Sequence, residues 1–188
     1  VIRVPYNNPG DIKKAYDVGA VGVMVPQIDT PEDAMNAVKW AKYPPVGQRG
    51  IAPFFAGYLG VSAQDIIDNA NDETILMLQM ESVEAYENLD EILAVPGYEV
   101  LLVGPTDLSA SLGVNGDIHN SKVENIMTDV AQRIKGSGKY LSTTFGDVED
   151  CRRWIAEGYQ MMNVSSTLAL GTIQTKQIFS ELREQFKV

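Results

Sequence analysis

The sequence is poor in several residue types on which common functions depend. It contains one cysteine and one histidine among 188 residues. The single cysteine, Cys151, cannot form an internal disulfide, so a reducing compartment and a cytoplasmic location are expected. There are 15 basic residues against 25 acidic ones, a net charge of −10, which disfavours nucleic acid as a partner. No apolar run approaches the roughly 20 residues that cross a bilayer, so no membrane contact is expected.

Several motifs that mark catalytic or nucleotide sites are also missing. No Gly-x-Gly-x-x-Gly follows an apolar run and no Walker-type lysine loop occurs, which disfavours the nucleotide-binding folds. Nothing resembles a Ser-His-Asp or Cys-His set. The one histidine, His119, lies in a polar stretch without a neighbour that would orient its ring, so a place on a loop is favoured over a general-base role. Buried packing is the favoured role for Cys151.

The chain does contain short apolar runs, rich in β-branched residues, that alternate with helical patterns. Strands are predicted at residues 2–5, 21–26, 75–80, 100–103, 140–144 and 161–164, and helices at 9–18, 30–42, 62–70, 83–94, 122–135, 148–157 and 168–186. Strands that are apolar on both faces and separated by helices form a buried parallel sheet. The pattern therefore predicts one α/β domain over residues 1–188 with six βα units. Six units can form an open doubly wound sheet or most of an eight-unit barrel.

Two of the predicted strands end in a carboxylate, Glu81 in one and Asp107 in the other. Adjacent parallel strands lie about 4.8 Å apart and their carboxyl ends share one edge, so both side chains can converge on one cation, which favours the barrel. Two carboxylates without cysteine or histidine suit Mg²⁺ or Mn²⁺, with Co²⁺ as an alternative. In the alternative role, backbone N–H groups hold both as helix-starting carboxylates. Spacing alone does not decide between these roles.

Other polar residues are predicted at the same edge of the sheet. The stretch Gly104–Asp107 is a tight turn into a helical start, and its N–H groups can hold a substrate carboxylate. Arg3 lies on an apolar strand, where its guanidinium must pair with a neighbouring strand or face a site. Gln79 stands two residues before Glu81, so it faces the same side of that strand and can bind a substrate or a water.

Four stretches of the sequence together resemble a known family. They are Arg3-Val-Pro-Tyr-Asn, Tyr43-Pro-Pro-x-Gly-x-Arg-Gly50, Gln79-Met-Glu81 and Gly104-Pro-Thr-Asp-Leu-Ser109. In the same order, and over essentially the whole chain, they resemble the HpcH/HpaI aldolases, metal-dependent class II pyruvate aldolases that include 4-hydroxy-2-oxo-heptanedioate and 2-dehydro-3-deoxyglucarate aldolases. The resemblance implies a (β/α)₈ TIM barrel. It also implies an aldol lyase that cleaves a 4-hydroxy-2-oxo acid to pyruvate and an aldehyde through a metal-stabilised pyruvate enolate.

The resemblance also implies roles for individual residues. Glu81 and Asp107 match the family's two metal-binding carboxylates, and Arg3 matches its catalytic arginine. Asp17 matches an acidic residue that approaches the site of a neighbouring subunit. Because the family assembles as hexamers, a homo-oligomer, hexameric or trimeric, is expected to form through the last helix, 168–186. The substrate-binding positions implied are Gln79, Gly104, Pro105, Thr106 and Asp107.

The sequence departs from the family pattern in three places. Thr106 stands where alanine is usual, and Ala52-Pro-Phe-Phe55 where the loop is often rich in Gly and Ser, so a reshaped aldehyde pocket is expected. The chain begins where the family's third strand begins. The first two βα units, with the family's histidine base and its aspartate partner, are therefore expected in a longer natural protein, because a barrel without them exposes apolar strand edges.

Three other functions, one of them non-catalytic, would use some of the same residues. An oxaloacetate decarboxylase would use the same enolate, and a non-catalytic paralogue would bind a 2-oxo acid or a metal without reaction. A citrate-lyase-like enzyme would need a basic patch for a CoA thioester, and none is evident. The aldolase is favoured because Arg3, Gln79, Glu81 and Asp107 occur together.

Overall fold

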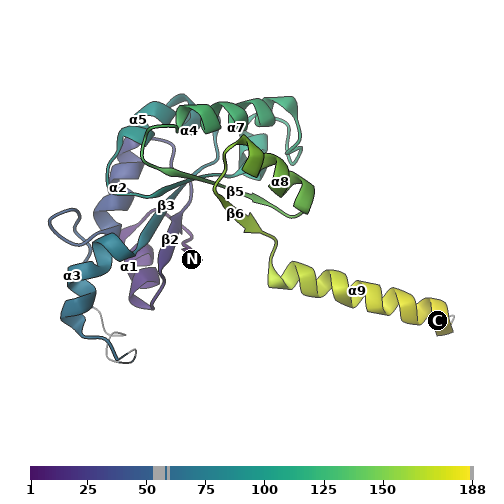
Figure 1. Cartoon of the computed structure of the whole chain (residues 1–188), viewed down its shortest axis with the longest axis horizontal. Helices are drawn as coiled ribbons and strands as arrows, with labels where there is room; N and C mark the ends of the chain where they lie inside the picture. The colour runs from purple at the N-terminus through teal and green to yellow at the C-terminus, as the bar shows by residue number, and fades with distance from the viewer. Residues whose placement is uncertain (53–57, 59, 187–188) are drawn as a thin grey trace.

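Six parallel strands form a single sheet in the computed structural model, which describes residues 1–52, 58 and 60–186. The strands pair in chain order from β1 to β6. Among the described residues β1 and β6 are the two edges, and the sheet curves as half of a barrel wall (Figure 1). The strands are β1 (Ile2–Arg3), β2 (Gly22–Val25), β3 (Ile75–Met80), β4 (Val100–Val103), β5 (Tyr140–Phe145) and β6 (Met161–Val164). The predicted parallel α/β architecture is confirmed.

Helices follow every strand. They are α1 (Pro9–Asp17), α2 (Pro31–Ala41), α3 (Ala63–Glu73), α4 (Val83–Glu87), α5 (Leu89–Ala94), α6 (Pro105–Ser111), α7 (Ser121–Arg133), α8 (Val148–Glu157) and α9 (Thr167–Phe186). The prediction of a single helix over 83–94 is wrong, because the helix is interrupted at Asn88, which separates α4 from α5. The side-chain amide of Asn88 donates a hydrogen bond of 2.8 Å to the carbonyl of Asp29. The helical start predicted at Gly104–Asp107 is the beginning of α6.

Short polar side chains decide where several helices begin. Asn8, Ser62, Ser82 and Asp147 each accept a hydrogen bond from the backbone N–H three residues ahead, which satisfies a group that the helix itself leaves unpaired. At the start of α2, Thr30 and Asp33 form a reciprocal capping box. These caps set the lengths of the loops between strands and helices.

The two faces of the sheet are packed differently. On the outer face, strand residues such as Val23, Leu76 and Leu101 join helix residues in one large core. The inner face carries a small apolar cluster of Met24, Met77, Val100 and Leu102, against which Ile75 and Met161 pack. Every member of that cluster comes from a strand or its end, so the described helices cover only the outer face. None of the described helices is long and apolar enough to cross a membrane.

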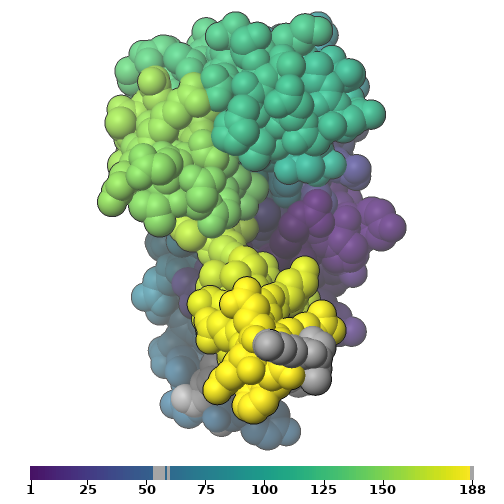
Figure 2. Space-filling view, turned by 90° about the vertical axis from the view of Figure 1, so that its right-hand side faces the viewer, coloured from purple at the N-terminus to yellow at the C-terminus, as the bar shows by residue number. Residues whose placement is uncertain are grey.

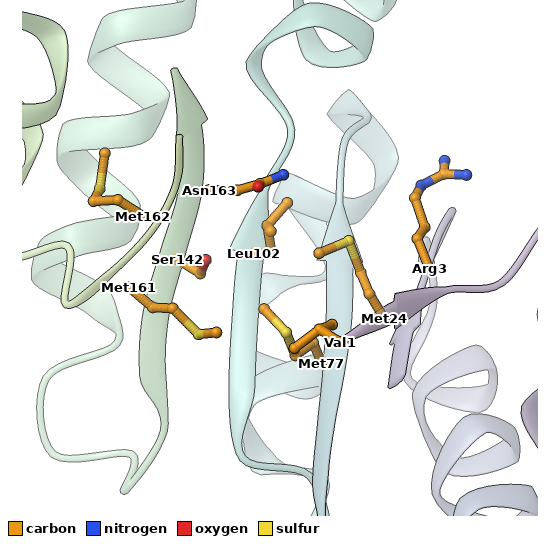
Figure 3. Close-up of a pocket in the computed structure, with 9 residues that line it drawn as sticks. All are labelled: Val1, Arg3, Met24, Met77, Leu102, Ser142, Met161, Met162 and Asn163. Atoms are coloured by element: carbon orange, nitrogen blue, oxygen red, sulfur yellow. The ribbon is translucent and has the colours of Figure 1, made fainter. Parts of the chain in front are cut away.

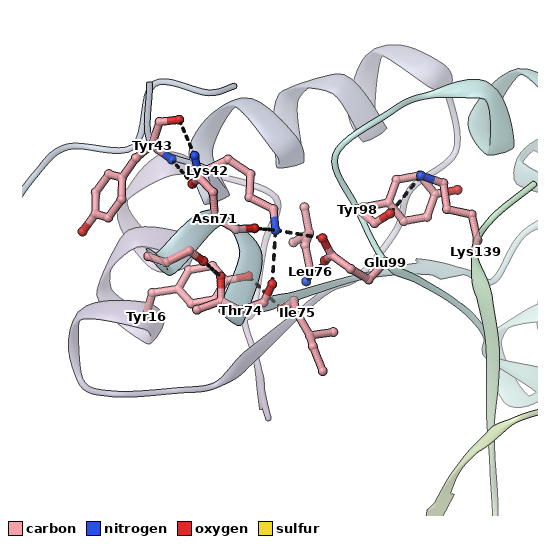
Figure 4. A network of polar contacts seen from close by, with 11 residues as sticks. Tyr16, Lys42, Tyr43, Asn71, Thr74, Ile75, Leu76, Tyr98, Glu99 and Lys139 are labelled. Atoms are coloured by element: carbon pink, nitrogen blue, oxygen red, sulfur yellow. Dashed lines mark hydrogen bonds and ion pairs between the residues drawn. The ribbon is translucent and has the colours of Figure 1, made fainter. Parts of the chain in front are cut away.

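A buried lysine ties elements together at the amino ends of the strands (Figure 4). Lys42 is 2% exposed, and its ammonium donates to the carbonyls of Asn71 (2.9 Å) and Thr74 (3.1 Å) and to Oε1 of Glu99 (2.8 Å). The other oxygen of Glu99 accepts the N–H of Leu76 at 2.6 Å. The network joins the end of α2, the end of α3 and the starts of β3 and β4, so it stabilises the end of the sheet opposite to Glu81.

Replacement of Glu99 tests this network. In Glu99→Ala the Lys42 ammonium loses its counter-charge and the Leu76 N–H its acceptor, and the free energy of unfolding is expected to fall by about 2 kcal/mol. Asp90→Ala is the control, because Asp90 pairs with Arg133 on the surface and is 76% exposed. It should change stability by less than about 0.5 kcal/mol. Urea unfolding measures both, and equal losses would contradict the structural role of the Lys42–Glu99 pair.

Candidate active site

Glu81 is the buried centre of the site at the carboxyl ends of the strands. It follows β3 directly and is 5% exposed. Its Oε1 accepts a hydrogen bond of 2.9 Å from the backbone N–H of Gln27, in the loop after β2. Its Oε2 accepts from the side-chain amide of Gln79, two residues earlier on the same face of β3. A carboxylate removed from water needs such donors, so both contacts fix where the charge lies.

Arg3 reaches the same carboxylate through Gln79. The Arg3 Nε donates to Oε1 of Gln79 at 3.1 Å, and this contact leaves the amide nitrogen of Gln79 to face Glu81. Arg3 thus lies on the edge strand β1, yet it is connected to β3 across β2. Its terminal guanidinium nitrogens donate no hydrogen bond within the described part of the chain, so they remain available to a ligand.

Gly104 brings the start of α6 against Glu81. The N–H of Gly104 donates to the carbonyl of Met80 at 3.0 Å, which continues the β3–β4 ladder by one step. A Cβ on Gly104 would lie 3.1 Å from Oε2 of Glu81 and 3.0 Å from Nε2 of Gln79, so any larger residue would have to push these side chains by a few tenths of an ångström. The next residues begin α6, and Asp107 lies in its first turn. Among the described residues, no side chain caps the first N–H groups of α6.

Burial and a neighbouring carboxylate both act on the charge of Glu81. Burial raises the pKa of Glu81 to about 7; the N–H of Gln27 lowers it, the nearby Asp107 carboxylate raises it and Arg3 lowers it. Asp107 itself is exposed. Two neighbouring carboxylates, one of them buried, form a hard-oxygen donor set of the kind that binds Mg²⁺ or Mn²⁺. Within the described residues no group of three or more His, Cys, Asp or Glu side chains gathers to hold a metal ion.

A cleft of about 240 Å³ opens on the inner face of the sheet (Figure 3). Met24, Met77, Leu102 and Met161 form its apolar wall, and Arg3 and Asn163 belong to its lining. In Figure 3 the guanidinium of Arg3 points toward the carboxyl ends of the strands, and Asn163 projects over the cleft from β6. Arg3 therefore belongs both to this cleft and to the polar chain that reaches Glu81.

A comparison with models of known protein families shows to which family the chain belongs. The model of the HpcH/HpaI aldolase/citrate lyase family matches residues 1–171. The chain belongs to this family. The resemblance found in the four sequence stretches is therefore confirmed.

Characterised members of the family are similar along most of the chain. A 2-keto-3-deoxy-L-rhamnonate aldolase of Klebsiella pneumoniae is 38% identical over 161 residues, which cover 82% of this chain and 59% of the relative. A hydroxypyruvate/pyruvate aldolase of Deinococcus radiodurans is 37% identical over 178 residues, which cover 93% of this chain and 64% of the relative. The chain thus spans less than two thirds of the length of either relative.

A solved structure of the family has the same fold. The crystal structure of a HpcH/HpaI aldolase/citrate lyase family protein from Burkholderia cenocepacia superposes with a TM-score of 0.87 at 34% identity, covering 96% of this chain and 72% of that one. The six parallel strands described above are therefore those of an HpcH/HpaI aldolase fold.

Two of the residues that the sequence singled out lie away from this site. Asp17 ends α1, where its carboxylate pairs with Lys13 and, at 2.7 Å, with Arg49. His119 is 56% exposed on the loop before α7, with its ring nitrogens 3.7 Å from Glu124 and 3.5 Å from Asp150. The structure therefore groups neither of them with Glu81, and the predicted loop position of His119 is confirmed.

Two further residues lie in packed parts of the structure. Arg49 lies between the rings of Tyr16 and Tyr43, 4.9 and 4.5 Å from their centroids, a structural position. Cys151 is 8% exposed within the core, as predicted. The unusual loop residues 53–55 lie outside the described part of the chain.

Sequence reasoning missed Gln27. Its contribution comes from the backbone, whose φ of 54° lies in the left-handed region that residues other than glycine seldom adopt. The strand order does contain a signal for Gln27. Because β2 lies between β1 and β3, the loop after β2 must pass between Arg3 and Glu81. Asn163 was missed because its strand, β6, pairs only with β5 in the described chain.

The close approach of Gly104 can be tested without any assumption about activity. Gly104→Ala places a methyl group against Gln79 and Glu81 and should lower the free energy of unfolding by about 1–2 kcal/mol. Gly10→Ala is the control, because its Cβ would meet only Oδ1 of Asn8, at an ordinary 3.4 Å. Chemical denaturation of both variants measures the difference. A Gly104→Ala protein as stable as the wild type would show that the Glu81 carboxylate is not packed there.

Proposed function

We propose that the protein containing this chain is an aldol lyase, which cleaves a 4-hydroxy-2-oxo acid to pyruvate and an aldehyde. The observation that carries the proposal is the arrangement of Arg3, Gln79, Glu81 and Asp107 at the carboxyl edge of one sheet. Active sites of barrel enzymes lie at this edge. The named relatives are aldolases of 2-oxo acids, which supports the same reaction class.

Glu81 and Asp107 would hold a divalent cation, Mg²⁺ or Mn²⁺, with Co²⁺ as an alternative. The fit rests on two neighbouring carboxylates that have no cationic partner in direct contact among the described residues, and on the glycine at the turn where α6 begins. When bound, the cation supplies Lewis-acid stabilisation of the negative charge on the 2-oxo group. With only two protein carboxylates, coordination positions remain for the two oxygens of a 2-oxo acid.

Arg3 and the turn into α6 would hold the substrate. The free guanidinium nitrogens of Arg3 stabilise the charge that develops on the 2-oxo oxygen as the C3–C4 bond breaks, a preorganised interaction worth several kcal/mol. Gln79 keeps Arg3 in place. The uncapped N–H groups of Thr106 and Asp107, preceded by Gly104 and Pro105, would bind the substrate carboxylate.

The base that removes the proton from the 4-hydroxyl group is not among these residues. A guanidinium has no lone pair to accept a proton, an amide side chain is not a base, and both carboxylates are assigned to the cation. We expect the base on the part of the relatives' barrel that this chain does not match. In the same way we expect the six strands to belong to a (β/α)₈ barrel, whose remaining strands would cover the apolar inner face of Met24, Met77 and Leu102.

Exchange of the pyruvate methyl protons for deuterium tests the proposed chemistry. Enolate formation exchanges these protons in D₂O. Proton NMR of the whole protein that contains this chain should therefore show loss of the methyl signal with Mn²⁺ or Mg²⁺ and none with EDTA. Asp107→Ala should reduce the exchange rate at least a hundredfold, since it removes a cation ligand. Asp90→Ala is the control at an exposed acidic residue. Metal-dependent pyruvate binding without exchange would favour a binding protein, and full exchange by Asp107→Ala would refute the assignment.

We further propose that α9 packs against a second copy of the chain. None of its 20 residues is buried. Its apolar side chains include Leu168 (79% exposed), Phe179 (60%) and Phe186 (62%). Figure 1 shows the helix extending from the body of the molecule, and Figure 2 shows it from its far end, in front of the body. So much apolar surface on one helix marks an interaction site. The family resemblance implies a hexamer or trimer, to which Asp17 would contribute at a neighbour's site.

Light scattering after size-exclusion chromatography tests this assembly. The wild-type chain should elute as an oligomer, and Phe179→Glu should shift it toward the monomer, because a charge replaces an apolar contact. Gln177→Glu on the same helix is the control and should leave the mass unchanged. A monomeric wild-type chain, or an oligomer that Phe179→Glu leaves intact, would contradict the role of α9.

A further inference from the structure

The loop after β2 holds the Glu81 carboxylate through its backbone. The N–H of Gln27 reaches Oε1 of Glu81 because Gln27 adopts a left-handed conformation, with φ of 54°. The next residue, Ile28, donates its N–H to the carbonyl of Gln79 at 3.1 Å. A left-handed backbone at a residue with a side chain is unfavourable, and it persists only where the surroundings hold it. The loop must therefore be fixed by contacts beyond Gln27.

Asp29 supplies those contacts. Its side-chain oxygen Oδ1 accepts a hydrogen bond from the hydroxyl of Ser82, the residue directly after Glu81. Its backbone carbonyl accepts from the amide of Asn88 at 2.8 Å. Ser82 begins α4 and Asn88 ends it, so Asp29 connects the β2 loop to both ends of the helix that follows Glu81. Glu81 is thus enclosed between two segments that Asp29 joins.

We propose that Asp29 is a positioning residue for cation binding at Glu81. By holding the loop to the turn, it keeps the Gln27 N–H on Oε1, so that Oε2 stays beside Gly104, where the turn that carries Asp107 begins. Asp29 itself takes no part in binding a ligand. This inference rests on the proposed function only in assigning a divalent cation to Glu81 and Asp107.

A purely structural role for Asp29 makes a different prediction. If Asp29 only stabilised the loop, its loss would lower the melting temperature but leave the cation affinity of the folded protein unchanged. Asp33 provides the matched comparison. It lies at the start of α2, and its carboxylate accepts hydrogen bonds from the N–H (3.0 Å) and hydroxyl (2.6 Å) of Thr30. Among the described residues, the Asp33 carboxylate makes no hydrogen bond to the segment around Glu81. Asp33→Ala therefore weakens the same region without releasing Glu81.

The experiment is a titration of the intact chain with Mn²⁺ alone, in which free Mn²⁺ is read from its electron paramagnetic resonance signal. Asp29→Ala should raise the Mn²⁺ dissociation constant about tenfold, the usual effect of removing an outer partner of a metal ligand. Asp29→Asn, which keeps an oxygen to accept from Ser82, should bind within about threefold of the wild type. Asp33→Ala should bind as the wild type does, although it melts at a lower temperature.

Each other outcome has a defined meaning. Unchanged affinity in Asp29→Ala, or an equal loss in Asp33→Ala, would overturn the inference alone. A wild-type chain that binds no Mn²⁺, or an Asp107→Ala variant that binds it normally, would overturn the proposed cation site and this inference with it. If Asp29→Ala does not fold, Asn88→Ala removes the contact to the Asp29 carbonyl and should weaken Mn²⁺ binding in the same direction; normal binding there would also overturn the inference.

Discussion

The burial of the Glu81 carboxylate is the constraint on which the carboxyl edge of the sheet depends. A charge that is 5% exposed must be met by hydrogen-bond donors, and here they come from two different segments. The loop after β2 provides the N–H of Gln27, and β3 provides the amide of Gln79, which Arg3 of β1 orients. The turn after β4 contributes Gly104, because a side chain there would crowd Gln79 and the Glu81 carboxylate. Four successive strands thus meet at one carboxylate.

The arrangement of charged side chains differs between the two ends of the sheet. At the amino ends, Lys42 has Glu99 and Arg49 has Asp17, so each buried cation has an anion beside it. At the carboxyl ends, two carboxylates are neighbours, and the guanidinium of Arg3 reaches Glu81 through the amide of Gln79. The paired charges at the amino ends stabilise the fold. The two neighbouring carboxylates at the carboxyl ends are instead suited to bind a ligand of positive charge. This division is typical of βα barrels, whose stability and chemistry lie at opposite ends.

Two apolar surfaces remain without a partner within the described residues. One is the inner face of the sheet around Met77 and Leu102, and the other is α9. The chain covers 72% of the Burkholderia cenocepacia structure, so that protein contains further chain that has no counterpart here. Additional strands on the inner face and a second copy on α9 would bury these surfaces.

The sequence by itself determined the features that follow from local periodicity. Apolar runs of strand length separated by helical patterns determine a parallel sheet, and the two-residue period of a strand places Gln79 beside Glu81. Parallel strands end at one edge, so Glu81 and the turn before Asp107 had to meet. Only the tertiary structure decided the left-handed backbone of Gln27, and the break in the helix at Asn88, whose partner Asp29 lies 59 residues away. The physical reason is that both depend on hydrogen bonds between segments distant in the chain, which no local pattern encodes.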